Sequence, residues 1–551
     1  MLRFFNFVIR VWHKFSFKQK FIFITCISLI VFGLIGTTII LFNHFTHEVP
    51  APGGSLKLGL VGHLSSLNPI LSQSNDCDRD LINLIYNGLY QINGQDELEP
   101  SLVEKIEINP DGKQYTLFLK DNILWHDGLP FTADDVVFTI ETIQNPKTKS
   151  PLSLNWQGVV VERISSSVVR FNLTNSYEPF LQNLTLKIIP KHIWENIPPE
   201  DLFHNEYNIK PIGTGPYLFD NLEKDSSGKI SAYSLIANEH YFKPAPKITR
   251  LIFNFYDDYQ SVKEALLKNE IEGFSPLSLS DYEFFVNKKS YQIKTLFLPR
   301  YFALFFNLNK ALLNNKDFRQ ALDLAIDRNE LIKTILHQQA FALTGPISPG
   351  FWSYLELAND FNPHEAQELI NKIKNTKGAP SELKITLSLP DSQELVEVAK
   401  FLVSSWEKIG VTTDLQILPL SDLEKNVIQT RSYEILLFGE IISQDPDLFA
   451  FWHSSQITDP GLNLSAYKNK DLDKLLEETR QIQNQTQRLN NLSSIQQILN
   501  QDKPALFLYN PYYLYLLPNK VKGVSMKYAN LPAERWLDIT NWFIKTRRVF
   551  K

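Results

Sequence analysis

The sequence predicts a mixed α/β protein of two or three subdomains, preceded by one membrane-spanning helix. The chain has 551 residues, which is more than one hydrophobic core usually serves, so several subdomains are expected. Strand-like and helix-like segments alternate through the C-terminal half, a pattern typical of α/β units with a mostly parallel sheet. Near the N-terminus, residues 21–42 form an uncharged apolar run that is long enough to cross a bilayer as a helix.

The N-terminal flank of this apolar run is basic. Five Lys or Arg residues precede it, and the first acidic residue is Glu48. This asymmetry predicts a cytoplasmic N-terminus and an exported remainder. A cleaved signal peptide would have a shorter apolar stretch and a small-x-small site after it, and a lipoprotein would have a small residue before its cysteine, whereas Cys26 follows Ile24 and Thr25. The sequence therefore favours an uncleaved anchor in a single-pass cell-membrane protein.

The first half of the exported part begins with a Pro- and Gly-rich segment over 43–55, which we interpret as a short, semi-extended linker that lifts the module off the membrane. Thr132 and Asp135 form a capping-box pair that predicts a helix over 136–143. Residues 211–217 are a glycine-punctuated connection that leads to a strand. Apolar periodicity predicts a further helix over 80–90 and strands over 56–61, 113–120, 159–163 and 168–173.

The second half alternates between apolar strands and amphipathic helices. Its spacing predicts strands over 301–307, 383–389, 413–418 and 433–438, and helices over 317–327, 364–374, 393–409, 471–480 and 485–501. The last residues, 545–551, are basic, and we interpret them as a solvated tail.

Charge and cysteine content restrict the classes of ligand and the source of stability. The chain has 55 Lys and Arg against 60 Asp and Glu, and five of the basic residues precede the apolar run, so the exported part has a net charge of about −10. A mildly acidic module without a basic stripe argues against nucleic acid or anionic lipid as its ligand. Cys77 has no partner in the exported part, because Cys26 lies in the apolar run, so stability is expected to come from the core and not from disulfides.

The motifs of common enzymes are not found. The sequence contains no HExxH, GxSxG, GxxxxGK[ST] or EF-hand-like loop and no zinc-type Cys/His spacing, so we expect no catalytic residue, metal or cofactor. His126 and Asp127 are interpreted as part of a structural turn. Glu440, Asp445 and Asp447 cluster after an apolar strand, which fits either glycoside hydrolysis or a ligand site at the end of a strand in an open α/β sheet.

Seven short blocks carry a resemblance to a known family. They are Leu67-Asn68-Pro69, Tyr86-Asn87-Gly88-Leu89, 98–104 (LEPSLVE), 115–136 with its WHDGLPFTADDV end, 211–217 (PIGTGPY), 318–328 (FRQALDLAIDR) and 406–411 (WEKIGV). In this order and spacing, over about residues 56–540, the chain resembles the family 5 extracellular solute-binding proteins, the oligopeptide-, dipeptide- and nickel-binding subunits of ABC importers.

The resemblance implies a two-lobed periplasmic-binding-protein-like fold of type II, cluster C, with an extra domain on the N-terminal lobe. The ligand is then enclosed as the lobes close about a hinge. The implied partners are a peptide or other small solute and ABC permease subunits, with no nucleic acid and with the chain as a monomer. The expected units are a cytoplasmic segment 1–20, an anchor 21–42, a linker 43–55, lobe I (56–86, 212–295 and 507–551), an extra domain 87–211 and lobe II 296–506.

The resemblance also implies where a ligand binds. In peptide-binding members the ligand backbone pairs with a strand, so that the main chain supplies affinity while roomy pockets tolerate varied side chains. A loop from the N-terminal lobe would face the end of that strand, and a tyrosine on the last crossing would form a wall. The residues at these positions here are Phe438, Gly439, Glu440, Ile441 and Ser443 on the strand, Gln73, Ser74 and Asn75 in the loop, and Tyr509 as the wall.

The chain departs from the family pattern at the ammonium site. Peptide binders carry Gly-Trp here and then an Asp that pairs with the α-ammonium of the ligand, whereas Gly439 is followed by Glu440 and the Asp position falls on Ser443 or Gln444. A buried ammonium without a countercharge is costly. Either Glu440 or Asp445 therefore replaces that Asp, or the ligand is not a free peptide N-terminus.

These features lead to a transport receptor without turnover as the first hypothesis. A surface hydrolase that uses Glu440, Asp445 or Asp447 is the second hypothesis. A third is a ligand-sensing or scaffold protein that retains the fold and serves another membrane partner.

Overall fold

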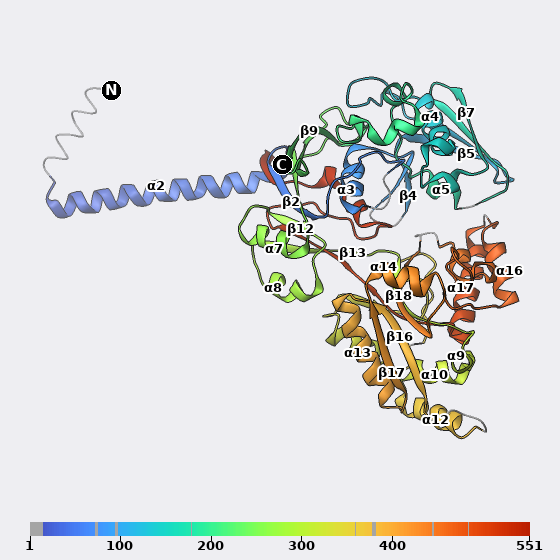
Figure 1. Cartoon of the computed structure of the whole chain (residues 1–551). Coiled ribbons are helices and arrows are strands. Elements are labelled where there is room, and N and C mark those ends of the chain that lie inside the picture. The colour runs from blue at the N-terminus through green and yellow to red at the C-terminus, as the bar shows by residue number, and fades with distance from the viewer. Residues whose placement is uncertain are drawn as a thin grey trace.

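The computed structural model describes residues 15–71, 75–93, 97–177, 179–358, 360–376, 382–442, 446–482 and 484–551. Two large β-sheets organise the chain, and helices and loops pack around each of them (Figure 1). We call the body around the seven-stranded sheet lobe I and the body around the six-stranded sheet lobe II. A long helix projects from lobe I, well apart from both lobes (Figure 1).

The sheet of lobe I combines strands from both ends of the chain. Its order is β13 (Tyr291–Leu296), β20 (Tyr513–Pro518), β12 (Gly273–Ser275), β2 (Ser55–Val61), β11 (Arg250–Tyr256), β10 (Ile230–Ala237) and β9 (Tyr217–Lys224). The central β2 pairs in parallel with both of its neighbours, and the remaining pairs are antiparallel.

Lobe II is a sheet with a hydrophobic cluster on each face. Its order is β15 (Ala340–Ala342), β19 (Ala505–Pro511), β14 (Arg300–Phe306), β18 (Ile435–Ile441), β16 (Lys384–Pro390) and β17 (Thr412–Leu418). One cluster includes the buried residues of α10 (Lys316–Leu324), α12 (Pro363–Lys374) and α13 (Gln393–Glu407), and the other those of α16 (Lys470–Thr479) and α17 (Gln485–Asp502). All the predicted elements of this half are present, with ends within three residues of the prediction.

The mostly parallel sheet that was predicted for the C-terminal half is not found in lobe II. In lobe II only β16 has parallel neighbours, β17 and β18, and the three other pairs are antiparallel. Part of the reason lies in β19 and β20, two strands that follow the last long helix and were not predicted. β19 joins the sheet of lobe II, where it pairs antiparallel with both of its neighbours, and β20 joins the sheet of lobe I. They are almost wholly buried apolar runs, and such runs lack the alternation from which a strand is predicted.

The extra domain has its own sheet and shares the core of lobe I. Its strands run in the order β5 (Val103–Ile108), β6 (Gln114–Leu119), β8 (Val168–Leu173) and β7 (Val159–Ser165), with α4 (Ala133–Gln144) packed against them. One continuous hydrophobic cluster joins this domain to the lobe I strands and to residues 515–542. We therefore expect the extra domain and lobe I to move as one body, because close-packed interiors do not slide freely.

Two chain crossings connect the lobes. One runs from β13 to β14 through 297–299, and the other runs from β19 to β20 through Tyr512. The Phe297 ring lies 5.0 Å from the Tyr512 ring and 5.2 Å from the Tyr528 ring, measured between centroids. The buried Asn510 amide donates to the Leu298 carbonyl at 2.7 Å, which ties the two crossings together. This cluster is where a hinge between the lobes would act.

The segment after the anchor is a strand and not a free linker. Helix α2 (Phe17–Phe45) is exposed along its whole length and is long and apolar enough to cross a bilayer. It leads directly into β1 (Thr46–Ala51), which pairs antiparallel with β21 (Lys545–Phe550). The predicted linker over 43–55 and the predicted solvated tail over 545–551 are therefore corrected. Each segment is polar when taken alone, and only their pairing satisfies the backbone groups that both expose.

Helix α3 (Asp76–Ile85) begins and ends earlier than the helix predicted over 80–90. Asn75 caps its N-terminus by accepting from the Cys77 amide at 2.9 Å. It ends at Ile85, where Tyr86 is already extended, and the Asn87 side chain beyond it bonds to the hydroxyl groups of Tyr241 and Thr214. The capping box of Thr132 and Asp135 is confirmed at the start of α4.

Candidate binding site between the lobes

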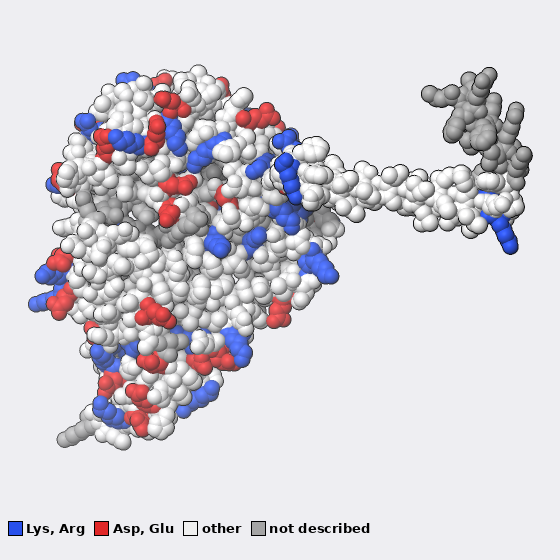
Figure 2. All heavy atoms as spheres, turned by 180° about the vertical axis from the view of Figure 1, so that it is seen from behind, with Lys and Arg blue, Asp and Glu red and all other residues white. Residues whose placement is uncertain are grey.

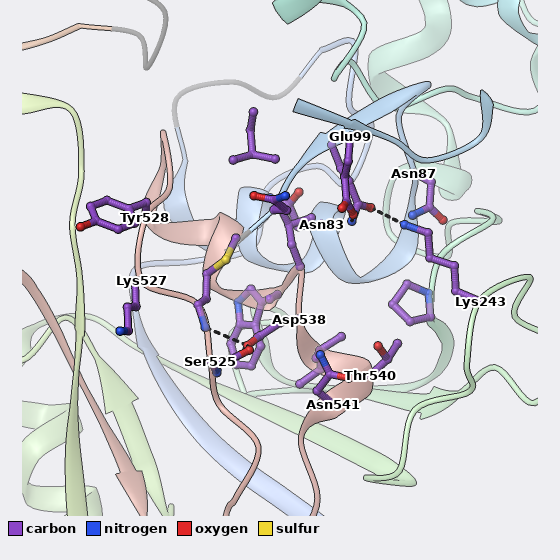
Figure 3. Close-up of a pocket in the computed structure, with 18 of the residues that line it drawn as sticks. Asn83, Asn87, Glu99, Lys243, Ser525, Lys527, Tyr528, Asp538, Thr540 and Asn541 are labelled. Carbon is purple, nitrogen blue, oxygen red and sulfur yellow. Dashed lines mark hydrogen bonds between the residues drawn. The ribbon is translucent and has the colours of Figure 1, made fainter. Parts of the chain in front are cut away.

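Three adjoining cavities run along lobe I and the extra domain and reach lobe II, and we call them together the cleft. The first, of about 590 Å³, lies within lobe I between residues 83–99, Lys243 and the 525–541 segment (Figure 3). The second, of about 210 Å³, shares Asn83 and Gln91 with the first and reaches the extra domain. The third, of about 530 Å³, is lined by extra-domain residues and by Asp447 and Arg480 of lobe II.

The predicted strand residues lie at the end of β18, and the predicted wall residue lies beside them. Phe302 of β14 pairs with Gly439 on one side and with Tyr509 of β19 on the other, so the three residues form a row across the sheet. The Phe302 ring stacks on Tyr509 at 5.2 Å and fills the space that a side chain at position 439 would need. Tyr509 is fully buried and donates to Glu394 at 3.2 Å, while Ile441 is 62% exposed.

Glu440 points into the sheet core and away from solvent. Its carboxyl accepts a hydrogen bond from the Tyr301 hydroxyl, and its other oxygen is buried without a hydrogen-bond partner. Burial raises the pKa of this carboxyl to about 8, and the Tyr301 bond and the charge of Arg431 only partly oppose that rise. Glu440 is therefore largely protonated at neutral pH and is not placed to neutralise a ligand ammonium in the cleft.

The other predicted site residues are divided between described and undescribed parts of the chain. Gln73, Ser74, Ser443 and Asp445 lie outside the described residues. Asn75 caps α3, and its amide donates to the His63 carbonyl at 2.5 Å. Of the predicted residues that the structure describes, only Asp447 lines one of the three cavities above, the third.

The end of β18 has an open edge. Its pairing with β16 stops at Leu436, whereas its pairing with β14 continues to Ile441. Because the Ile442 amide donates to Pro299 on the β14 side, the alternation along a strand directs the N–H and C=O groups of Gly439 and Ile441 to the opposite side. Among the residues that the structure describes, no strand pairs with these outward backbone groups, and they have the pattern that an added strand would use.

Arg300 is a partly buried charged residue on the β14 side of this strand end, opposite the open edge, and it was not predicted from the sequence. It pairs with Ile441 across the two strands, and its Nη2 donates to the Pro511 carbonyl at 3.3 Å. Burial lowers its pKa, while the charges of Glu394 and Asp76 oppose that shift. The available signal was an arginine at the first position of an apolar strand.

Lysines with few acidic partners line the lobe I part of the cleft. Lys243 donates to the Gln91 side chain at 2.9 Å and lies near Glu99 (Figure 3). Burial lowers its pKa to about 8, and Lys120 and Lys187 add to that shift. Burial likewise lowers the pKa of Lys187 to about 8. An anionic group in the cleft would relieve this repulsion, because it favours the charged form of both lysines.

The acidic residues of the cleft are already satisfied by donors. Asp538 accepts from the amides of Ser525 and Met526 at 2.7 and 2.9 Å and from the Trp542 indole at 2.6 Å. Glu534 accepts from the Asn530 amide at 2.6 Å. The cleft therefore combines carboxylates that already accept hydrogen bonds with two lysines whose pKa is lowered by burial.

An ion pair lies where the extra domain meets lobe II. Arg480 donates to Asp447 through Nε at 3.0 Å and Nη2 at 2.8 Å. Its guanidinium lies over the Phe449 ring at 4.3 Å and over the Tyr177 ring at 5.7 Å. Since Tyr177 belongs to the extra domain, this contact joins the two sides of the cleft at its outer end. With Asp447 paired and Glu440 buried, neither is placed as a free catalytic carboxylate.

Two of the sequence blocks pack against each other and support lobe I. The His126 Nδ1 accepts from the Gly213 amide at 3.1 Å, and its Nε2 lies 3.0 Å from the Gly215 carbonyl. A Cβ atom at Gly213 would lie 1.9 Å from the Ile85 carbonyl oxygen at the end of α3. Burial lowers the pKa of His126 to about 4, so the ring is neutral. The structural interpretation of His126 and Asp127 agrees with these contacts, and Asp127 in turn binds His192 at 2.8 Å.

Two lobes with two crossings and a cleft that runs along lobe I and reaches lobe II define a two-lobed solute-binding protein. Residues 97–460 match the family model of the bacterial extracellular solute-binding proteins, family 5. The chain belongs to this family.

Individual relatives agree in length and fold. The oligopeptide-binding protein AppA of Bacillus subtilis is 27% identical over 513 residues, which cover 90% of this chain and 92% of AppA. The ABC transporter substrate-binding protein CtaP of Listeria monocytogenes superposes with a TM-score of 0.80 at 27% identity, covering 90% of this chain and all of CtaP. NikZ of Campylobacter jejuni, in complex with Ni(L-His), superposes with a TM-score of 0.71 at 27% identity, covering 89% and 99% of the two chains.

Proposed function

We propose that this chain is a membrane-anchored solute-binding protein of an ABC importer that captures peptides between its two lobes and delivers them to a permease. Helix α2 anchors the chain with its N-terminus in the cytoplasm, and the module works outside as a monomer without catalysis. The relatives named as oligopeptide- and dipeptide-binding proteins support the peptide ligand. The basic N-terminal flank of the apolar run supports the orientation.

The open edge of β18 is the observation that carries the peptide assignment. A peptide laid along residues 437–441 would pair with the outward N–H and C=O groups of Gly439 and Ile441. Pairing of this kind uses only main-chain groups of the ligand, and it therefore tolerates varied side chains. Among the residues that the structure describes, no cluster of His, Cys, Asp and Glu could hold a metal ion. These residues therefore offer no support for a metal complex of the kind seen in NikZ.

The charges of the cleft indicate how the ligand is oriented. Lys187, Lys243 and Arg300 favour a carboxylate, and Glu440 is unsuited to an ammonium group. We therefore place the ligand's anionic groups toward the lysines of lobe I, and we expect acidic peptides to bind more tightly than basic peptides of equal length.

The test removes one backbone donor from the open edge. Ile441→Pro deletes the outward N–H, which has no partner in the sheet, while Ile441→Ala keeps it and removes the exposed side chain. A hydrogen bond contributes about 1 kcal/mol net, so the proline variant is expected to bind short peptides about fivefold more weakly or worse in calorimetry, and the alanine variant is expected to bind nearly as well as the wild type. Equal affinity of the two variants would refute strand addition at β18. No binding of any peptide by the folded wild-type protein would refute the peptide assignment itself.

A further inference from the structure

The junction between the anchor and the module carries a local charge opposite to that of the module. We call β1, β21 and Lys551 together the juxtamembrane ribbon. Its one acidic residue, Glu48, is engaged by Arg548 at 3.8 Å and by Thr546 at 3.4 Å. Lys545, Arg547 and Lys551 are exposed and have no ion-pair partner among the residues that the structure describes. The base of the projecting helix is accordingly marked by basic side chains in Figure 2.

The ribbon is joined to the end of α2 by several contacts. The Lys551 amide donates to the Phe45 carbonyl at 2.9 Å. The Thr46 hydroxyl donates to the Phe42 carbonyl at 2.5 Å and accepts from Arg548 at 3.0 Å. The Arg548 guanidinium also lies 5.6 Å from the centre of the Phe42 ring. These contacts satisfy carbonyl groups that a helix end leaves free, and they connect helix and ribbon without a flexible segment.

The position of the ribbon relative to a bilayer follows from the helix. The uncharged run ends at Phe42, and its 22 residues span about 33 Å at 1.5 Å per residue, which matches a hydrocarbon core of about 30 Å. Thr46 then lies about 6 Å beyond the hydrocarbon edge, within the headgroup layer. Phe550, which pairs with Thr46, is 78% exposed, and Phe45 is 56% exposed. Exposed Phe rings at this depth can be buried at the boundary between headgroups and acyl chains, as the apolar side chains of interfacial segments are.

The basic residues of the ribbon lie at different distances from the lipid headgroups. Lys551 follows Phe550 at the level of the helix end, and Arg547 pairs with Val49, three residues farther along β1. Lys545 pairs with Ala51, about 17 Å from Thr46 at 3.4 Å per residue. The Debye length at physiological salt is about 8 Å, so Lys551 lies within range of headgroup charge, Arg547 lies at the margin of that range at about 10 Å from Thr46, and Lys545 is largely screened.

We propose that the juxtamembrane ribbon binds anionic phospholipid headgroups of the outer leaflet and thereby sets how the module stands on the membrane. This inference rests on the proposed anchoring by α2 but not on the identity of the solute. An isolated two-stranded ribbon is only marginally stable in water, and its contacts with the helix end and with lipid supply the missing support. Because helix and ribbon form one continuous unit, lipid contact holds the cleft at a defined orientation to a permease in the same bilayer.

The experiment measures lipid selectivity of the full chain. The protein is reconstituted in phosphatidylcholine bilayers with spin-labelled phosphatidylglycerol or spin-labelled phosphatidylcholine, and the ratio of their association constants is taken from the motionally restricted component of the electron spin resonance spectrum. A basic residue near an anionic surface contributes about 1 kcal/mol, or about fivefold at one lipid site. Averaged over the lipid shell, the double change Arg547→Glu with Lys551→Glu is expected to lower the ratio at least twofold.

Three matched variants make the outcome specific. Lys545→Glu alone is expected to lower the ratio much less, because of its distance from the surface. Lys468→Glu with Lys470→Glu, at the start of α16 and on the far side of the module (Figure 1), is expected to leave the ratio unchanged. Arg547→Gln with Lys551→Gln is expected to give an intermediate ratio. The basic residues on the cytoplasmic flank are common to all these chains and cancel in the comparison.

The outcomes separate this inference from the proposed function. A ratio that is the same in the wild type and in the Arg547→Glu, Lys551→Glu chain overturns the proposal, and so does an equal loss in the Lys468→Glu, Lys470→Glu control. Calorimetry with short peptides on the same preparations reports the cleft independently. Absence of peptide binding with retained lipid selectivity would count against the proposed function and leave the lipid contact standing.

Discussion

Replacement of Glu440 by glutamine should change how the stability of the protein depends on pH. The carboxyl is buried against Tyr301, and one of its oxygens has no hydrogen-bond partner. Its pKa is raised from 4.5 to about 8 in the folded chain, chiefly by burial. Between these two values the folded chain holds a proton that the unfolded chain has lost. The free energy of unfolding contributed by this group therefore falls as the pH rises from about 4.5 to about 8.

The size of the effect follows from the shift. Each unit of pKa corresponds to about 1.4 kcal/mol, so the raised pKa of Glu440 costs at most about 5 kcal/mol of stability at pH 8 relative to pH 4.5. Glu440→Gln does not titrate and keeps an acceptor for the Tyr301 hydroxyl. It leaves one amide without a partner, at a cost of about 1–3 kcal/mol that does not vary with pH. The variant should therefore be less stable than the wild type at pH 5 and more stable at pH 8.

Urea denaturation at intervals between pH 5 and pH 8 checks this prediction, with the free energy of unfolding compared between the two chains at each pH. Glu239→Gln is the matched control, because Glu239 is exposed and its replacement should give curves parallel to the wild type. The reasoning is refuted if the difference between Glu440→Gln and the wild type is the same at all pH values. That result would mean that Glu440 is ionised in the folded protein.

Three further predictions concern the cleft and its support. Gly213→Ala places a Cβ atom 1.9 Å from the Ile85 carbonyl oxygen, so we expect the free energy of unfolding to fall by several kcal/mol or the chain not to fold. Thermal unfolding measures this, and a wild-type melting temperature would contradict the close packing. Arg480→Ala removes the contact with Tyr177 across the cleft and should speed ligand release severalfold in stopped-flow measurements, while unchanged release would show that this contact does not hold the lobes together. Lys187→Met should weaken binding of acidic peptides about fivefold to tenfold and affect basic peptides little, whereas an equal loss for both in calorimetry would indicate a structural role.

Four of the six strands of the lobe II sheet and its longer helices could be predicted from the sequence, because the helices have one apolar face and the strands are separated from them by clear turns. The spacing of apolar residues in α13 and α17 reflects a single buried face, and this spacing can be recognised from the sequence alone. The capping box of α4 can also be recognised from the sequence, because its two partners are only three residues apart. The family blocks around His126 and Gly213 were also visible as motifs, although their mutual packing was not.

Contacts between residues far apart in the chain could not be predicted in this way. Gly439 was predicted as a site residue from the family resemblance, but the open edge beside it exists only because β16 pairs with β18 for a short distance. Arg300 and Lys187 were missed because a single basic residue in a sequence carries no sign of what surrounds it. Glu440 was considered as a countercharge, and its burial against Tyr301, 139 positions away, is what makes it unsuitable.

The sequence by itself determined that this chain has an apolar N-terminal helix with a basic flank, an α/β module after it and the motifs of a solute-binding family, because each of these is a local pattern of a few to some twenty residues. The tertiary structure decided how this helix is joined to the module and which side chains surround the cleft. The segments 46–51 and 545–550 are both polar and featureless when read alone, yet they pair at the membrane end of α2 because each supplies the backbone partners that the other lacks. Information of that kind resides in pairings across the length of the chain, and no local pattern contains it.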